Sequence, residues 1–96
     1  MDFELDGKSI RTLDEFHRQI GDRLDLGPFY GRNFNALRDL LSTDVERPLH
    51  LIWRDSAVSR AHLGAEAFDM AVDVLRATQN EDARMNRDER FTFTLA

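Results

Sequence analysis

The spacing of apolar residues in the first part of the chain predicts a strand followed by a helix. Residues 2–5 alternate between acidic and apolar side chains, which is typical of a strand. Residues 12–15 have the composition of a capping box, and apolar positions recur after them at helical spacing as far as Leu24. The pair Gly27-Pro28 then predicts that the helix ends and that a loop begins.

A second helix is predicted to start near Phe34. Asn33 is a good N-cap because its side-chain oxygen can accept a hydrogen bond from a free amide two or three residues later, and Gly31 permits backbone angles that most residues avoid. At about 100° per residue, apolar side chains fall on one side of this helix and polar side chains on the other. We expect the first set to pack and the second to face outward; the sets are Phe34, Leu37, Leu40 and Leu41, and Asn35, Arg38, Asp39 and Ser42.

The next part of the chain predicts a central strand and two further helices. Residues 49–53 are apolar except for His50, which is typical of a strand covered on both faces in the middle of a sheet. A short helix is predicted over residues 56–62, ended by Gly64, and a longer one over about residues 65–79. The inward side chains of the longer helix are expected to be Phe68, Ala71, Val72 and Leu75.

A hydrophilic stretch and a last strand complete the pattern. Nearly every residue from 79 to 90 is charged or carries an amide, which predicts a helix end and an exposed loop. Phe91, Phe93 and Leu95 alternate with threonines, which indicates a strand with one buried face. Because helices separate the strands, we expect parallel pairing and an α/β fold.

Length and composition limit what such a chain can do. A chain of 96 residues that is 42% hydrophobic predicts one domain over residues 1–96, too small to enclose a cofactor cleft, so no cofactor is expected. No cysteine is present, and the longest apolar run is far too short to span a membrane. The first five residues are acidic and alternating, unlike a secretory signal. We therefore expect a cytoplasmic protein that does not bind membranes.

The charge balance favours cationic partners. The chain has 13 basic and 18 acidic residues, a formal net charge of -5. This balance repels the phosphate backbone of nucleic acids and attracts basic surfaces. We therefore expect no direct binding to nucleic acid.

No set of residues predicts catalysis or metal binding. No histidine has a second histidine four residues away or a cysteine nearby, and the nitrogens of His50 are expected to find partners within the fold. The serines lack the setting of an activated nucleophile. The pair Glu81-Asp82 lies in a charged run, for which solvation is the expected state. We predict no enzyme activity and no metal site; the three histidines are His17, His50 and His62.

The stretch from Tyr30 to Leu40, together with residues 45–49 and 52–54, resembles the barstar family of ribonuclease inhibitors. The resemblance implies a two-layer fold in which a three-stranded parallel sheet packs with about four helices. It also implies that the loop and helix over residues 29–44 plug the active site of a small, basic microbial ribonuclease. In this interpretation Asp39 takes the place of a substrate phosphate.

Several residues match the family's binding segment and others depart from it. Tyr30, Gly31, Asn33 and Ser42 match, the first two as residues that shape the loop. Asn35 replaces an acidic residue, Phe29 replaces a tyrosine, and Arg38 and Asp44 stand where the family has tryptophans. Ala77 replaces an acidic residue of the fourth helix, for which Asp73 or Glu81, one turn away, can substitute. The implied partner-binding residues are Phe29, Tyr30, Gly31, Asn33, Asn35, Arg38, Asp39, Ser42, Thr43, Asp44, Asp73 and Glu81.

The functional hypothesis is an inhibitor that is a monomer when free and binds one ribonuclease molecule. An alternative is a protein-binding module of the same fold that regulates a partner other than a nuclease, which the changes at Asn35 and Ala77 leave open. A small enzyme with Asp39 as a base and Arg38 as an electrophile is disfavoured, because an outer helix face offers no cleft that excludes water. The polar face is also compatible with simple solvation.

Overall fold

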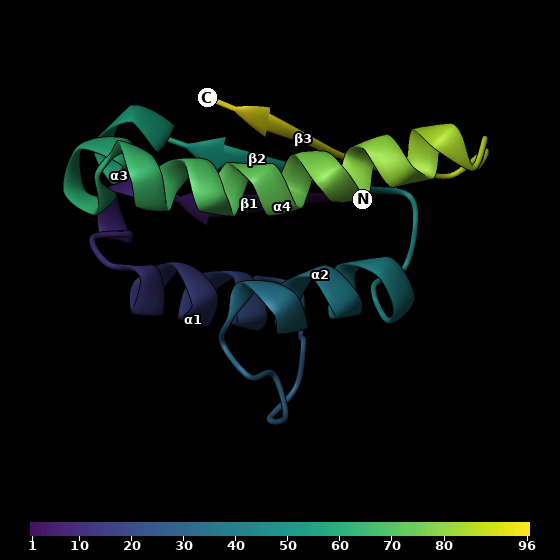
Figure 1. Cartoon of the computed structure of the whole chain (residues 1–96), viewed down its shortest axis with the longest axis horizontal. Coiled ribbons are helices and arrows are strands. Elements are labelled where there is room, and N and C mark those ends of the chain that lie inside the picture. Colours follow the sequence, from purple (N-terminus) through teal and green to yellow (C-terminus); the bar gives the residue numbers. More distant parts are fainter.

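The computed structural model describes residues 1–96 and contains three strands and four α-helices (Figure 1). The strands form one sheet in the order β1-β2-β3, and both neighbouring pairs are parallel. The predicted α/β class, the parallel pairing and the central place of the strand at residues 49–53 are therefore confirmed. In chain order the elements are β1 (Asp2–Asp6), a 3-10 turn η1 (Gly7–Ser9), α1 (Leu13–Arg23), α2 (Phe34–Thr43), β2 (Leu49–Arg54), α3 (Ser56–Leu63), α4 (Ala65–Arg84) and β3 (Phe91–Leu95).

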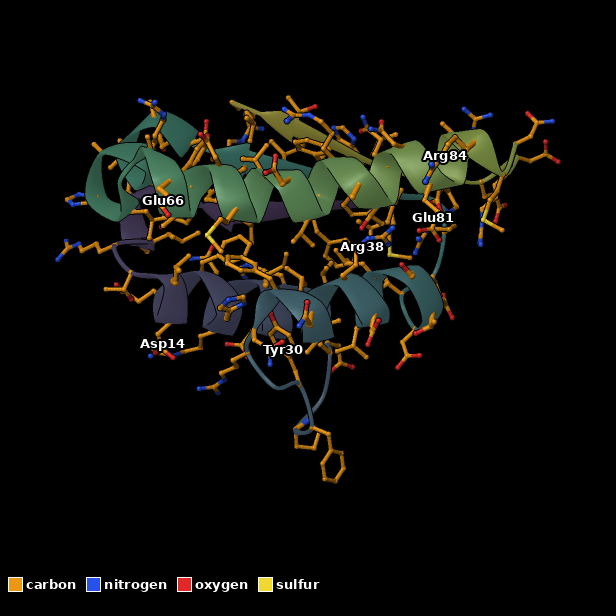
Figure 2. All side chains as sticks on the ribbon, viewed as in Figure 1. Asp14, Tyr30, Arg38, Glu66, Glu81 and Arg84 are labelled. Atoms are coloured by element: carbon orange, nitrogen blue, oxygen red, sulfur yellow. The ribbon has the colours of Figure 1, made fainter.

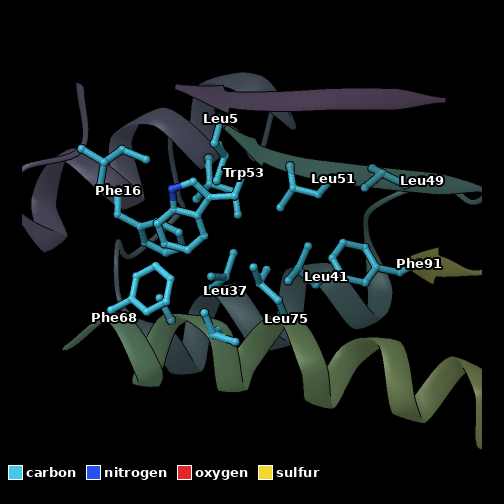
Figure 3. Close-up of a cluster of buried hydrophobic side chains, with 14 of the residues drawn as sticks. Leu5, Phe16, Leu37, Leu41, Leu49, Leu51, Trp53, Phe68, Leu75 and Phe91 are labelled. Atoms are coloured by element: carbon cyan, nitrogen blue, oxygen red, sulfur yellow. The ribbon is translucent and has the colours of Figure 1, made fainter. Parts of the chain in front are cut away.

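The α-helices pack against one face of the sheet, and the core lies between the two layers. Figure 3 shows side chains from the strands directed toward the helices. Trp53 is fully buried, and its ring centroid lies 5.1 Å from those of both Phe16 and Phe68. Its indole Nε1 donates to the hydroxyl of Ser59 at 3.0 Å, and that hydroxyl donates to the carbonyl of Gly7 at 2.8 Å. The buried tryptophan therefore has the polar partner that its indole requires.

The opposite face of the sheet is open and polar, so the prediction that β2 is covered on both faces is wrong. His50 and Ile52 of β2 point to this face and are only half-buried. The ring nitrogens of His50 lie 2.7 Å from the hydroxyl of Thr92 and 3.0 Å from that of Thr94, which confirms that His50 finds its partners within the fold. An apolar residue in a short strand therefore does not guarantee that a second layer covers it.

Helix α4 is longer than the sequence pattern predicts. It ends at Arg84 and not near Gln79, so much of the hydrophilic stretch is helical and the predicted exposed loop is shorter. The four side chains predicted to point inward are buried as expected; they are Phe68, Ala71, Val72 and Leu75. Beyond them, Gln79 accepts a hydrogen bond from the Phe93 amide at 3.0 Å. None of the helices combines the length and apolar character needed to cross a membrane.

Strand β3 is only partly as predicted. Phe91 is fully buried and Phe93 half-buried, but Leu95 keeps 39% of its surface exposed, so the buried face ends before it. The strand lies at the edge of the sheet, where side chains of α4 bond its outward amides. These bonds occupy donors that would otherwise be free to pair with another strand.

Candidate partner-binding surface

The loop between α1 and α2 projects from the body of the molecule (Figures 1 and 2). Its sharp course requires positive φ angles at Asp25, Gly27 and Arg32, of 52°, 85° and 52°. The side chain of Phe29, next to the proline of this loop, is 97% exposed. Single exposed apolar side chains are common on protein surfaces, so this ring becomes informative only together with the polar groups of the helix that follows.

Tyr30 anchors the loop from the inside. Its side chain is buried, and its hydroxyl oxygen lies 2.5 Å from Nδ1 of His17 on α1. Burial raises the pKa of the Tyr30 hydroxyl, and the charge of Arg32 offsets part of that rise. Burial lowers the pKa of His17, although the charge of Asp14 acts in the opposite direction. Both groups are therefore held in their neutral forms, and Tyr30 shapes the loop.

The role of His17 was missed by the sequence interpretation, which considered it only as a metal ligand. A signal was present, because His17 falls within the apolar stripe of α1, between Phe16 and Ile20, both of which are fully buried. A polar residue in such a stripe needs a partner inside the fold. On the α1 side of the loop lies an open cavity of about 430 Å³ with mixed charges on its walls; its lining residues are His17, Arg18, Gly21, Asp22, Asp25, Gly27, Pro28, Tyr30 and Arg32.

Helix α2 begins as predicted and presents a row of polar groups. The side chain of Asn33 accepts a hydrogen bond from the Ala36 amide at 2.8 Å, which confirms the N-cap. Asn35, Asp39 and Thr43 follow at intervals of four residues and are all exposed. These intervals place them on one stripe of the helix surface.

Asp39 has a free carboxylate. Its side chain makes no ion pair, and the one side-chain contact at this residue is the bond from the hydroxyl of Thr43 to the backbone carbonyl of Asp39, at 2.8 Å. The last turn of α2 contains no basic residue, and Asp44 caps it. The negative end of the helix dipole therefore adds to these carboxylates.

Arg38 does not lie on the outer face where the sequence pattern placed it. Its side chain is 29% exposed and bridges α2 to α4, donating to the hydroxyl of Ser42 and to the carboxylate of Glu81, which is 31% exposed (Figure 2). Three of the predicted partner-binding residues are thus bonded to one another. Asp73 is 72% exposed and 3.7 Å from Arg76, also an exposed residue, so it remains accessible.

The sequence interpretation also did not identify a buried ion pair between the turn after α2 and helix α4. Nε of Arg47 lies 2.7 Å from a carboxylate oxygen of Asp82, with 9% and 3% of the two side chains exposed. Arg47 also donates to the carbonyl of Val45 at 2.7 Å, and Asp82 accepts from the Phe91 amide at 2.7 Å. The expectation that Asp82 is solvated is therefore wrong. The pair ties the turn after α2 to α4 and to β3.

The pKa of Asp82 reflects this setting. Burial alone raises it, but the hydrogen bond from Arg47, the Phe91 amide and the charges of Arg47 and Arg87 outweigh burial, and the pKa is lowered. Asp82 continues the inward stripe of Leu75 and Thr78, a spacing that distinguishes it from the exposed residues around it.

The accessible side chains of the loop and of α2 form a candidate binding surface. No group of three or more histidine or acidic side chains is placed to hold a metal ion. The accessible groups are the aromatic tip Phe29 and the stripe of Asn35, Asp39 and Thr43. Such a surface can offer an aromatic contact and an unpaired carboxylate to a basic partner.

Comparison with known proteins identifies the family. The model of the family described as Barstar (barnase inhibitor) matches residues 1–96. The chain is also 34% identical over 77 residues to a Bacillus subtilis (strain 168) protein provisionally named the ribonuclease inhibitor YrdF; the match covers 80% of this chain and 84% of the relative. The chain therefore belongs to the barstar family. Both comparisons support a role as a ribonuclease inhibitor.

Proposed function

We propose that the protein inhibits a small, basic bacterial ribonuclease of the barnase type, in a complex of one molecule each. The loop around Phe29 and the outer stripe of α2 enter the active site, where Asp39 occupies the place of a substrate phosphate. The protein carries out no chemistry of its own. The observation that supports this proposal most directly is the exposed carboxylate of Asp39, which forms no ion pair and lies on the helix that follows the projecting loop.

The charge of the chain agrees with this role. A ribonuclease active site has to attract RNA phosphates and is therefore cationic, while this chain carries a net charge of -5. Complementary charge speeds the encounter and penalises partners of the same sign. The barnase–barstar pair is itself a known example of such steering, so charge complementarity is not independent of the family relationship.

The surface is also held in shape before the partner arrives. The Tyr30–His17 contact fixes the base of the loop, and the Asn33 cap fixes the start of α2. A surface that is already ordered loses less conformational entropy on binding. The exposed ring of Phe29 gains most from burial against a partner, because nearly all of its area faces water in the free protein.

The Asp39→Ala variant tests the proposal. Removing one charge of a buried, hydrogen-bonded pair leaves the other without a partner, so the variant should lose about 2 to 5 kcal/mol of affinity for a barnase-type ribonuclease. Most of this loss should appear as faster dissociation. Thermal unfolding should be nearly unchanged, because the Asp39 side chain makes no contact that stabilises the fold.

The matched control is Asp69→Ala, which removes an exposed and unpaired carboxylate from α4. This control should bind like the wild type. If Asp39→Ala also binds like the wild type, the phosphate-mimic role is wrong. If the wild-type chain binds no ribonuclease of this class, the alternative of a partner other than a nuclease is favoured.

A further inference from the structure

We propose that Glu81 acts as the counter-ion of Arg38 and holds its charge away from the face that carries Asp39. This inference rests on the proposed function, because it concerns how α2 remains attractive to a cationic active site. In this role Glu81 positions Arg38 and does not itself contact the partner. This role differs from one in which a carboxylate of α4 binds the nuclease directly.

The need for a counter-ion follows from the charges of the binding segment. Residues 29–46 carry two basic side chains, Arg32 and Arg38, and three acidic ones, Asp39, Asp44 and Glu46. Arg38 immediately precedes Asp39 in the helix. A guanidinium free to turn outward at this place would repel the same cationic site that Asp39 attracts.

The geometry shows how the charge is held. Arg38 donates to Ser42, one turn later on α2, and to Glu81 on α4. Figure 2 shows Arg38 and Glu81 between these two helices. Both members of the ion pair are about two-thirds buried, which limits screening by solvent. Because neighbouring residues of a helix point in different directions, Arg38 can be drawn toward α4 while Asp39 still faces outward.

The same pairing leaves Asp39 as the accessible carboxylate. Glu81 is already occupied by Arg38, and Asp39 has no internal cation. A partner arginine therefore meets an unpaired acceptor at Asp39, whereas at Glu81 it would have to displace Arg38. The pair offsets the charge of Arg38 and leaves Asp39 as the unpaired carboxylate on the outer stripe of α2.

A double-mutant cycle between Glu81→Gln and Arg38→Met tests this role. The measured quantity is the dissociation rate from a barnase-type ribonuclease at about 0.5 M salt, where the Debye length is about 4 Å and mainly charges in contact have an effect. With Arg38 present, Glu81→Gln should speed dissociation on the order of tenfold, because the freed guanidinium faces the cationic site. With Arg38→Met, the same change should have less than about a twofold effect.

A charge-swapped variant, Arg38→Glu with Glu81→Arg, provides a second measurement. It keeps the ion pair and should dissociate at close to the wild-type rate. If Glu81 touched a basic residue of the partner, the swap would place an arginine there and dissociation would become much faster. Asp69→Asn is the control for loss of one negative charge from α4 and should leave the rate unchanged.

The outcomes separate the possible explanations. Faster dissociation of Glu81→Gln in both backgrounds would overturn the inference and make Glu81 a direct contact. A lower melting temperature with unchanged dissociation would also overturn it and make the pair only a clamp between helices. A wild-type chain that does not bind the ribonuclease would contradict the proposed function itself, before the cycle is compared.

Discussion

Replacing Asp82 with alanine should destabilise the protein by about 3 to 5 kcal/mol, because the change leaves a buried arginine without its partner. The side chain of Arg47 is 9% exposed and has no other carboxylate within ion-pair distance. The Phe91 amide would also lose its acceptor, which lies at 2.7 Å. Against a typical stability of about 5 to 15 kcal/mol, this loss is large enough to unfold a substantial fraction of a marginally stable chain.

Urea unfolding of the wild type and of Asp82→Ala at pH 7 gives the difference in unfolding free energy. The matched control is Asp73→Ala on the same helix, which breaks an exposed ion pair with Arg76 and should cost less than about 1 kcal/mol. A loss below about 1 kcal/mol for Asp82→Ala would refute the reasoning. It would mean that Arg47 reaches water or another acceptor at little cost.

The pH dependence provides an independent check of the same pair. Because the pKa of Asp82 is lowered on folding, its contribution is present above the ordinary value of 3.8 and is lost as the pH falls through the folded-state pKa. The stability difference between wild type and Asp82→Ala should therefore shrink below about pH 4. A difference that stays constant into that acid range would contradict the assignment of a charged Asp82.

Two further changes should act on the fold. The pKa of His17 is lowered, so folding favours its neutral form, and the stability of the wild type should fall as the pH drops below the ordinary value of 6.5. Urea unfolding at several pH values should show a smaller decline for His17→Gln than for the wild type. An equal decline in both proteins would assign the effect to another group. A Cβ at position 7 would overlap the backbone carbonyl oxygens of Arg54 and Asp55, so Gly7→Ala should lower the free energy of unfolding by at least about 3 kcal/mol. Thermal or urea unfolding measures this loss. A near-neutral result would show that the turn at Gly7 can move away from β2.

Much of the fold could be predicted because its local signals agree with one another. The capping box at residues 12–15 and the Asn33 cap begin helices where the apolar stripes also begin. Alternation of strands and helices was enough to predict parallel pairing around a central β2. What periodicity could not show is the number of layers, because a half-buried Ile52 on an open sheet face looks the same in sequence as a fully covered one.

The errors about individual polar residues have one physical origin. Periodicity assigns polar residues to the outside, but His17, Arg38 and Asp82 lie inward or at a helix boundary and bond partners 13, 43 and 35 residues away. A polar group in an apolar stripe is stable only when such a partner is present, and the local sequence does not reveal it.

These long-range polar contacts also hold the candidate binding surface in place from the inside of the fold. His17 fixes the base of the loop through Tyr30, Glu81 holds Arg38 beside α2, and Asp82 ties down the turn after α2. A residue-by-residue comparison of surfaces therefore overestimates how many side chains are free to meet a partner. After the internal contacts are accounted for, the side chains of the binding segment that remain free are the ring of Phe29 and the polar groups of Asn35 and Asp39. Changes at these residues should redirect binding, while changes at the paired residues should alter how that surface is presented.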